Sequence, residues 1–332
     1  MKALILVPFD PVALERLRQK VDIIHESWMD TRRLLSPEEL IDRIQNDDIQ
    51  IVIVEADFIF DEVFENTDRL RFIGICRNTV NNVDIEAATE HGVLVVNTPA
   101  RNAVSVAELT IGLILSLARH IPAAHPIVKS GRWLDPVEPY IRLRGVELAN
   151  KKAGIVGFGA IGSEVGKRLR AFDMDVLVYD PLVKSERIIE IGARQVDLGQ
   201  LMKESDFITL HCPVSAETTG LIGGNEIGMM KPTSCLINTA GWEVVDNEAL
   251  LYALEQGRIA GAAFDTFETH PVSSNSPFLS LDNVVLTPHI GGATDGTVKR
   301  YSQMIVDGIE KFINGERPEN LVNPEAWKVN GR

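Results

Sequence analysis

The chain has 332 residues, a length that predicts two domains at about 150 residues each. Its 45% hydrophobic and 24% charged residues are typical of a folded globular protein and exclude a disordered or collagen-like chain. Lysine and arginine number 33 against 47 aspartate and glutamate residues, so the formal net charge is −14. This acidity argues against nucleic acid or an anionic membrane as a partner.

The cysteines and the apolar segments indicate a cytoplasmic protein. Cys76, Cys212 and Cys235 are odd in number, widely spaced and without a CxxC pair, so we expect reduced thiols rather than disulfides or a metal site. The apolar N-terminal run soon reaches Asp10 and is typical of a first strand rather than a signal peptide. The most apolar stretch, residues 109–118, falls short of the roughly 20 residues that span a bilayer.

Short apolar runs alternate with helical patterns along the first hundred residues. Ser36, Pro37 and Glu39 predict a helix start, because they supply an N-cap, a proline at the first position and a capping box. Apolar runs separated by amphipathic helices are typical of parallel strands covered on both faces. We expect strands at residues 2–7, 21–25, 51–55, 71–76 and 93–96.

A long helix is expected from Ser105, and a second strand–helix series begins at Lys151. The amphipathic stretch 294–313 predicts a closing helix that returns to the first domain. We therefore predict an α/β fold in which residues 1–100 plus 291–332 form one domain and residues 101–290 form an inserted second. The strands of the inserted domain are expected at residues 153–156, 176–179, 207–210, 234–238, 259–264 and 283–286.

The run Gly157-Phe158-Gly159-Ala160-Ile161-Gly162 places GxGxxG between a predicted strand and a predicted helix. The first glycine permits a tight turn, the second lets a pyrophosphate approach the backbone, and the third allows close helix–strand packing. Asp180 follows at the end of the next predicted strand, where a carboxylate accepts ribose hydroxyls and repels a 2′-phosphate. A glycine-rich turn without a ligand is the alternative, but this register favours dinucleotide binding, with NAD preferred over NADP.

Several further motifs occur along the chain before and after the glycine motif. They are Asn97-Thr98-Pro99 with Ser105-Val106-Ala107-Glu108, Trp133, His211-Cys212-Pro213 with Thr218, Gly261-Ala262-Ala263-Phe264-Asp265, and Thr287-Pro288-His289-Ile290-Gly291-Gly292. Together with the glycine motif they resemble the D-isomer-specific 2-hydroxyacid dehydrogenases, the family of 3-phosphoglycerate dehydrogenase, glyoxylate reductase and D-lactate dehydrogenase. The resemblance covers about residues 70 to 315.

This resemblance implies two doubly wound parallel-sheet domains, a flavodoxin-like substrate domain and an inserted Rossmann domain that binds NAD. It also implies an oxidoreductase that acts on the CH–OH group of a 2-hydroxy acid, and a homodimer formed through the NAD-binding domain. The resemblance implies that His289 is the acid/base residue. An imidazole suits this role because it titrates near neutral pH. The alternative is that His289 has a purely structural role at the end of a strand. Cofactor contacts are implied at Cys212, Pro213, Thr218, Thr239, Ala240, Gly241, Asp265 and His289.

Three positions depart from the family's pattern. The arginine that binds the substrate carboxylate is replaced by Gly241, which the bulky Trp242 follows. The glutamate that pairs with the catalytic histidine is replaced by His270, and Glu268 is a candidate substitute. The glycine-rich substrate loop is replaced by Arg77-Asn78-Thr79.

Each departure leaves alternatives open. Arg77 either restores the lost positive charge from the opposite domain or is an ordinary solvated arginine, and Trp242 is either a pocket wall or a packing residue. The leading interpretation is an NAD-dependent oxidoreductase that acts on a small molecule through His289, His270 and Glu268, with Arg77, Asn78 and Trp242 in an altered substrate pocket. The alternatives are a catalytically weak NAD(H)-binding sensor or partner-binding protein, and an oxidoreductase whose substrate lacks the usual 2-oxo carboxylate.

Overall fold

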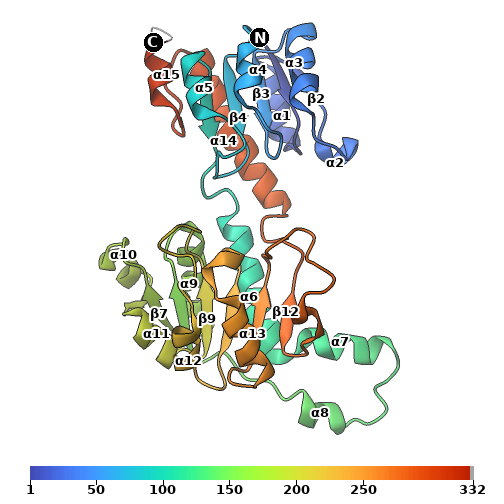
Figure 1. Ribbon diagram of the computed structural model, residues 1–332, viewed down its shortest axis with the longest axis vertical. Helices are drawn as coiled ribbons and strands as arrows, with labels where there is room; N and C mark the ends of the chain where they lie inside the picture. The colour runs from blue at the N-terminus through green and yellow to red at the C-terminus, as the bar shows by residue number, and fades with distance from the viewer. Residues whose placement is uncertain (330–332) are drawn as a thin grey trace. The chain divides into compact units, whose positions relative to one another are not determined.

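Two compact units make up the chain, each with its own parallel sheet. The computed structural model describes residues 1–329. Unit 1 consists of Met1–Arg101 and Thr294–Arg332, and unit 2 consists of Asn102–Ala293 (Figure 1).

In unit 1 the strands are β1 (Lys2–Ile5), β2 (Asp22–His25), β3 (Ile51–Val54), β4 (Phe72–Ile75) and β5 (Leu94–Asn97). They pair in the order β2-β1-β3-β4-β5, and every pair is parallel. Because Val54 pairs with Ile75 and Ile75 with Asn97, the carboxyl ends of these strands share one edge of the sheet.

Helices cover both faces of the unit 1 sheet, each with its own apolar core. One face packs against α1 (Pro11–Arg18), α14 (Asp295–Ile313) and α15 (Pro324–Val329). The other face packs against α3 (Pro37–Asn46), α4 (Asp61–Glu65) and α5 (Ile85–Glu90), while the short α2 (Trp28–Thr31) precedes α3. The predicted capping box is confirmed: Ser36 Oγ accepts from Glu39 N–H at 3.3 Å, and the Glu39 carboxylate accepts from Ser36 N–H at 3.0 Å.

In unit 2 the strands form a seven-stranded parallel sheet (Figure 1). They are β6 (Lys152–Val156), β7 (Asp175–Tyr179), β8 (Arg194–Gln195), β9 (Phe207–Leu210), β10 (Cys235–Asn238), β11 (Gly261–Phe264) and β12 (Val284–Leu286). Their order is β12-β11-β10-β9-β6-β7-β8, so the winding reverses between β6 and β9. In open sheets of this kind, ligands bind outside the carboxyl ends of the strands at such a switch point.

The helices of unit 2 also form two layers. One core includes residues of α6 (Ala103–Arg119), α9 (Ala160–Ala171) and α10 (Ser185–Glu190), and the other includes residues of α11 (Leu198–Glu204), α12 (Gly224–Met229) and α13 (Asn247–Glu255). Two 3₁₀ turns, η1 (Trp242–Val244) and η2 (Pro277–Ser280), follow β10 and precede β12. The segment between α6 and β6 carries α7 (Ile121–Lys129) and α8 (Glu138–Arg142), neither of which has a buried residue.

The fold class predicted from the sequence is confirmed, since both sheets are parallel and covered on both faces. All eleven predicted strands form, with ends that differ by at most two residues from the predicted ones. The structure adds β8, whose two residues are both exposed and therefore give no apolar signal in the sequence. Helix α6 begins at Ala103 rather than at Ser105, and Thr294 is the N-cap of the closing helix α14.

The three cysteines are free and buried, as predicted. Within residues 1–329, no single helix is long and apolar enough to cross a membrane; α6 and α7 meet that test only as a pair bent by 68°.

Candidate functional site

The glycine loop after β6 lies at the switch point of the unit 2 sheet. Gly157 has φ +89°, and a Cβ there would lie 2.5 Å from Cys212 N at the end of β9. A Cβ on Gly162 would lie 2.1 Å from the Gly157 carbonyl oxygen. Both positions therefore require glycine for protein packing alone.

Gly159 differs from these two glycines, because a Cβ there would meet no atom within 4 Å. It is the N-cap of α9 and provides no side-chain acceptor, so the N–H groups of Ala160 and Ile161 begin the helix beside open space. Such N–H groups and the positive end of the helix dipole attract phosphate groups. This loop fits the pyrophosphate of a dinucleotide.

Asp180 fixes the glycine loop as well as offering a carboxylate to a ribose. Its Oδ2 accepts from Phe158 N–H at 2.7 Å, and its Oδ1 accepts from Leu182 and Val183 N–H at 2.8 and 3.0 Å. A carboxylate has about four acceptor positions, so one remains for a hydroxyl. The bracing of the loop was not part of the sequence prediction.

The segment after β9 is held by its own side chains. Thr218 Oγ1 donates to the Pro213 carbonyl at 2.6 Å and accepts from Ser215 N–H at 2.8 Å. Cys212 is buried, and burial raises the pKa of its thiol. Thr218 therefore fixes the backbone at the exposed Pro213, beside the glycine loop.

The segment after β10 is arranged around Asn238. Its Oδ1 accepts from Ala240 and Gly241 N–H at 3.0 and 3.3 Å, and its Nδ2 donates to the Gly241 carbonyl at 2.8 Å. A Cβ on Gly241 would lie 2.3 Å from Val214 Cγ2. The Val214 side chain therefore takes the space in which a side chain at position 241 would begin.

His211 was quoted in a motif but was not assigned to the site. It hydrogen bonds through Nε2 to Thr209 Oγ1 at 2.9 Å, and Thr239 Oγ1 lies 3.5 Å from its Nδ1. Thr239 in turn contacts Thr110 Oγ1 at 3.3 Å. Desolvation lowers the pKa of His211 to about 3, so the imidazole is neutral and orients hydroxyl groups rather than carrying charge.

Trp242 packs into an aromatic cluster formed with Phe264, Phe267 and Phe278. The ring centroids lie 5.6, 6.2 and 5.4 Å from that of Trp242. Distances of this size are typical of stacked and edge-to-face aromatic pairs. The structure thus provides the contacts of the packing alternative, and the pocket-wall role stays a prediction.

Asp265 holds the loop that carries His289. Its side chain is 2% exposed, and Oδ1 accepts from Thr287 Oγ1 at 2.7 Å and from Ile290 N–H at 2.9 Å. Oδ2 accepts from Gly291 N–H at 2.7 Å. The sequence assigned this carboxylate to the cofactor, whereas its observed partners lie within the protein; the cofactor contact stays a prediction.

His289 and His270 lie against each other after β12 and β11. His289 Nδ1 is 2.8 Å from His270 Nε2, and the ring centroids are 4.7 Å apart. His289 has φ +54°, a left-handed conformation that is uncommon outside glycine and marks many functional turns. Of the two predicted partners, His270 forms the hydrogen bond, and Glu268 is an exposed residue two positions earlier.

The predicted substrate residues of unit 1 follow β4. The Arg77 carbonyl accepts from Thr98 N–H at 3.1 Å, and the Asn78 carbonyl accepts from Asn97 Nδ2 at 2.7 Å. Within residues 1–329, no ion pair involves the half-buried Arg77, whereas Arg101 binds Glu55 at 2.6 Å. Arg77 thus has a fixed backbone and a guanidinium without an acidic partner in the described chain.

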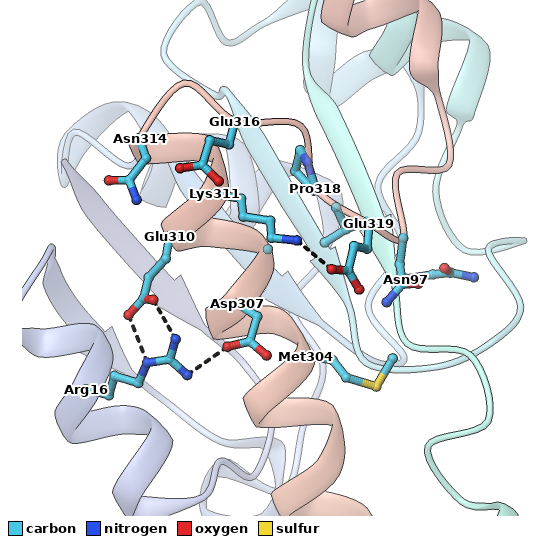
Figure 2. Close-up of a pocket in the computed structure, with 13 residues that line it drawn as sticks. Arg16, Asn97, Met304, Asp307, Glu310, Lys311, Asn314, Glu316, Pro318 and Glu319 are labelled. Atoms are coloured by element: carbon cyan, nitrogen blue, oxygen red, sulfur yellow. Dashed lines mark hydrogen bonds and ion pairs between the residues drawn. The ribbon is translucent and has the colours of Figure 1, made fainter.

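A separate groove of about 510 Å³ lies in unit 1 and carries none of the predicted site residues. Figure 2 shows ion pairs among its charged side chains: Arg16 pairs with Asp307 and Glu310, and Lys311 pairs with Glu319. Among the described residues, no three histidine, cysteine, aspartate or glutamate side chains are placed so that they could hold a metal ion.

Comparison with known proteins adds a family assignment. Residues 111–291 match the model of the NAD binding domain of D-isomer specific 2-hydroxyacid dehydrogenases. The chain is 40% identical over 290 residues to D-3-phosphoglycerate dehydrogenase of Methanocaldococcus jannaschii; the match covers 87% of this chain and 54% of that protein. It is 40% identical over 289 residues to glyoxylate reductase of Thermococcus litoralis, covering 86% and 87% of the two chains.

A solved structure, that of the TT0316 protein from Thermus thermophilus, matches with a TM-score of 0.82 and 32% identity, covering 97% of this chain and 100% of that one. The chain spans about half of the phosphoglycerate dehydrogenase that it matches and most of the glyoxylate reductase. It therefore belongs to the D-isomer-specific 2-hydroxyacid dehydrogenase family, a family of NAD-dependent oxidoreductases, as its motifs predict.

Proposed function

We propose that the protein interconverts a 2-hydroxy acid and a 2-oxo acid with NAD, through a substrate pocket altered from the family's pattern. The observation that carries this proposal is the His289–His270 hydrogen bond of 2.8 Å on a loop fixed by the buried Asp265. An imidazole held in this way is suited to move a proton to or from a substrate oxygen.

The residues of unit 2 fit an NAD molecule. Gly159 and the N–H groups that follow it would bind the pyrophosphate, and Asp180 would bind the ribose. Cys212, Pro213 and Thr218 would line the adenosine, and Thr239, Ala240 and Asp265 the nicotinamide. Bound NADH supplies the hydride that reduces the carbonyl carbon.

His289 supplies the proton of the reduction. Its Nδ1 is engaged by His270, so Nε2 is the nitrogen that serves the substrate. In the reductive direction Nε2–H donates to the carbonyl oxygen as the hydroxyl forms, and in the oxidative direction Nε2 takes that proton back. Glu268 would add negative charge near this pair from the exposed segment before His270.

Recognition of the substrate carboxylate falls to Arg77 and Asn78. Position 241 has no cation, and Val214 fills the space beside it. Arg77 has no acidic partner among the described residues, so its guanidinium is available to a carboxylate. Gly241 contributes backbone alone, and Trp242 supports this segment from the aromatic cluster.

The strongest alternative is a catalytically weak NAD(H)-binding protein with a sensing or partner-binding role. This alternative is favoured by position 241, where the arginine clamp of the family is absent and the Val214 side chain occupies the space of a side chain. The two functions share the cofactor and differ in turnover.

The segment between α6 and β6 supports a homodimer formed through unit 2. It exposes a series of large apolar side chains, which monomeric proteins rarely gather in one place. These are Ile121, Val128, Trp133, Leu134, Val137, Tyr140 and Ile141. We also propose a cytoplasmic location, which the three free cysteines support because thiols persist in reducing compartments.

Two glycine substitutions separate cofactor binding from folding. Gly159→Ala leaves the free energy of unfolding within about 0.5 kcal/mol, because its Cβ meets open space, yet weakens NADH binding about tenfold or more by obstructing the pyrophosphate. Gly162→Ala lowers the free energy of unfolding by about 1–3 kcal/mol through its clash with Gly157. Urea unfolding and calorimetric titration measure both. Gly228→Ala, also into open space, is the control, and full NADH affinity in Gly159→Ala would contradict the assignment.

Asp180→Asn tests the preference for NAD. The change keeps the size of the side chain, removes its charge and replaces one of its two accepting oxygens by an NH2 group that faces a backbone N–H. Loss of the charge raises the ratio of NADPH to NADH affinity about tenfold or more, and the lost hydrogen bond lowers the free energy of unfolding by about 1 kcal/mol. Asp180→Ala also removes the acceptor for the N–H groups of Phe158, Leu182 and Val183, and lowers the free energy of unfolding by about 1–3 kcal/mol. Asp175→Asn, at the start of the strand β7 that precedes Asp180, is the control. Equal affinity of the unchanged protein for NADP and NAD would show that Asp180 does not discriminate.

NADH oxidation with a panel of 2-oxo acids and of carbonyl compounds without a carboxylate tests the reaction itself. We expect kcat/KM for glyoxylate, pyruvate and hydroxypyruvate to lie below about 10⁴ M⁻¹s⁻¹, because the arginine clamp is absent. Arg77→Ala raises KM for carboxylate substrates about tenfold or more and leaves NADH affinity unchanged. The exposed Arg69→Ala is the matched control.

Two results would count against this assignment. Rapid reduction of small 2-oxo acids would contradict the altered pocket. NADH binding without turnover of any compound would favour the sensor.

Light scattering at micromolar concentration tests the homodimer. The expected mass is twice that of the 36.7 kDa chain. Leu134→Asp, at a side chain that is 88% exposed in the monomer, yields the monomeric mass because a charge would be buried in the interface. Val12→Asp in unit 1, 73% exposed, leaves the dimer intact. A monomeric mass for the unchanged protein rules the dimer out.

A further inference from the structure

An ion pair at the carboxyl edge of the unit 1 sheet joins two loops of that edge. Arg101 Nη2 binds Glu55 Oε1 at 2.6 Å, and the two side chains are 14% and 22% exposed. Glu55 follows β3, and Arg101 lies in the segment after β5. A pair that is so little exposed is screened less by water and salt than an ordinary surface pair. Its charges therefore bear on whatever else binds at this edge.

Arg101 is held on its other sides as well. Its guanidinium lies over the ring of Tyr301, 5.4 Å from the centroid, and its carbonyl accepts from Arg300 Nε at 2.7 Å. Tyr301 is 2% exposed, and its hydroxyl donates to the Pro8 carbonyl after β1. Helix α14 thus fixes both the backbone and the side chain of Arg101, while Glu55 is its acidic partner.

The register of the sheet brings Glu55 beside the loop of Arg77. Val54 pairs with Ile75, and Cys76 N–H donates to the Val54 carbonyl at 2.7 Å. Glu55 is therefore next to Cys76, since neighbouring strands lie about 4.8 Å apart. Burial raises the pKa of the Cys76 thiol, and the Glu55 carboxylate raises it further. Because Arg77 follows Cys76, a carboxylate and a guanidinium leave adjacent strands at the same edge.

The segment that ends at Arg101 also holds the loop of Arg77. Thr98 N–H donates to the Arg77 carbonyl at 3.1 Å, and Thr98 Oγ1 donates to the Ile75 carbonyl at 3.2 Å. These hydrogen bonds involve neither charge of the ion pair. Loss of the Arg101 charge therefore leaves the Arg77 backbone in place and changes the electrostatics of the edge.

The three charged side chains Arg77, Arg101 and Glu55 together carry a formal charge of +1. Without the Arg101 cation, a partly buried carboxylate would lose its partner, which is strongly unfavourable. Arg77 lies on the adjacent loop and forms no ion pair within residues 1–329, so its guanidinium would compensate that charge. A guanidinium bound to Glu55 is no longer available to a substrate carboxylate.

We propose that Arg101 is a positioning residue that acts through Glu55: it occupies this carboxylate and so leaves Arg77 available to the carboxylate of the substrate. The inference rests on the proposed function for the substrate role of Arg77, whereas the competition for Glu55 is a property of the three side chains. The ion pair then determines specificity, because it preserves the net positive charge that favours an anionic substrate over a neutral carbonyl compound.

Removal of the two charges, singly and together, tests this competition. Arg101→Met keeps an unbranched side chain against Tyr301 and raises KM for a 2-oxo acid about tenfold or more, with kcat and NADH affinity nearly unchanged. Glu55→Gln alone lowers KM by up to about threefold, because it removes the competing anion. In the double variant Arg101→Met with Glu55→Gln, KM returns to within about threefold of the unchanged protein.

Three controls separate this effect from damage to the fold. Arg101→Lys keeps the charge and retains most of the affinity for the 2-oxo acid. Arg16→Met removes the cation of an ion pair on α1 of the same unit and leaves KM unchanged. Urea unfolding shows that each variant is folded. A KM that stays normal in Arg101→Met would overturn the proposal. A double variant as impaired as Arg101→Met would also overturn it, because Arg101 would then bind the substrate itself or support the fold alone.

A measurement without turnover separates this inference from the proposed function. Oxalate, a small dicarboxylate, is titrated calorimetrically into the NADH-bound protein and the same variants. We expect its affinity to fall about tenfold or more in Arg101→Met and to recover in the double variant. This pattern in a protein that reduces no carbonyl compound would uphold the inference and refute the proposed function. Turnover of 2-oxo acids without this pattern, or no binding of oxalate, would overturn the inference instead.

Discussion

The buried carboxylate of Asp265 is the constraint on which the proposed chemistry depends. It follows β11 directly and accepts hydrogen bonds from Thr287, Ile290 and Gly291, and so joins the end of that strand to the loop after its neighbour β12. A buried carboxylate that lost these donors would be strongly destabilised, so the loop is held in one conformation. His289 lies within that loop at φ +54°, and His270 lies five residues beyond Asp265 on the same chain segment. The Asp265 side chain therefore holds the loop of His289, and the 2.8 Å contact between Nδ1 of His289 and Nε2 of His270 joins the second imidazole to it.

The parts of the fold that the sequence predicts well are those encoded by local pattern. Apolar runs between amphipathic helices predicted all eleven of the longer strands, and Ser36 and Glu39 predicted a helix start that the structure confirms. The glycine loop was predicted equally well, because the spacing of its glycines reflects close backbone contacts: Gly157 approaches Cys212, and Gly162 approaches Gly157. The exposed strand β8 was not predicted, since two exposed residues carry no apolar signal and pair only because β7 lies beside them.

The site was less predictable wherever a residue's role depends on neighbours distant in sequence. Asp180 was predicted from its position after a strand, but its hydrogen bond to Phe158 depends on how β6 and β7 pair. The sequence left two alternatives open for Trp242; its contacts with Phe264 and Phe278 support the packing alternative, and the pocket-wall role stays a prediction. The replacement of the arginine by Gly241 was visible in the sequence, whereas the Val214 side chain that fills its space was not.

The two departures in unit 2 remove charges of opposite sign. Gly241 replaces a cation of the family's pattern and His270 replaces an anion, so the formal charge of this region is unchanged while both ionic interactions are absent. In the proposed enzyme the acid–base residue His289 pairs with His270 instead of a carboxylate, and Arg77 on the loop after β4 takes the role of the carboxylate clamp. An arginine at position 241 alone would displace the Val214 side chain and would leave position 270, beside His289, without an acidic residue. Recovery of the family's chemistry therefore requires both charges, because the arginine of the family's pattern binds the substrate carboxylate and the glutamate pairs with the catalytic histidine.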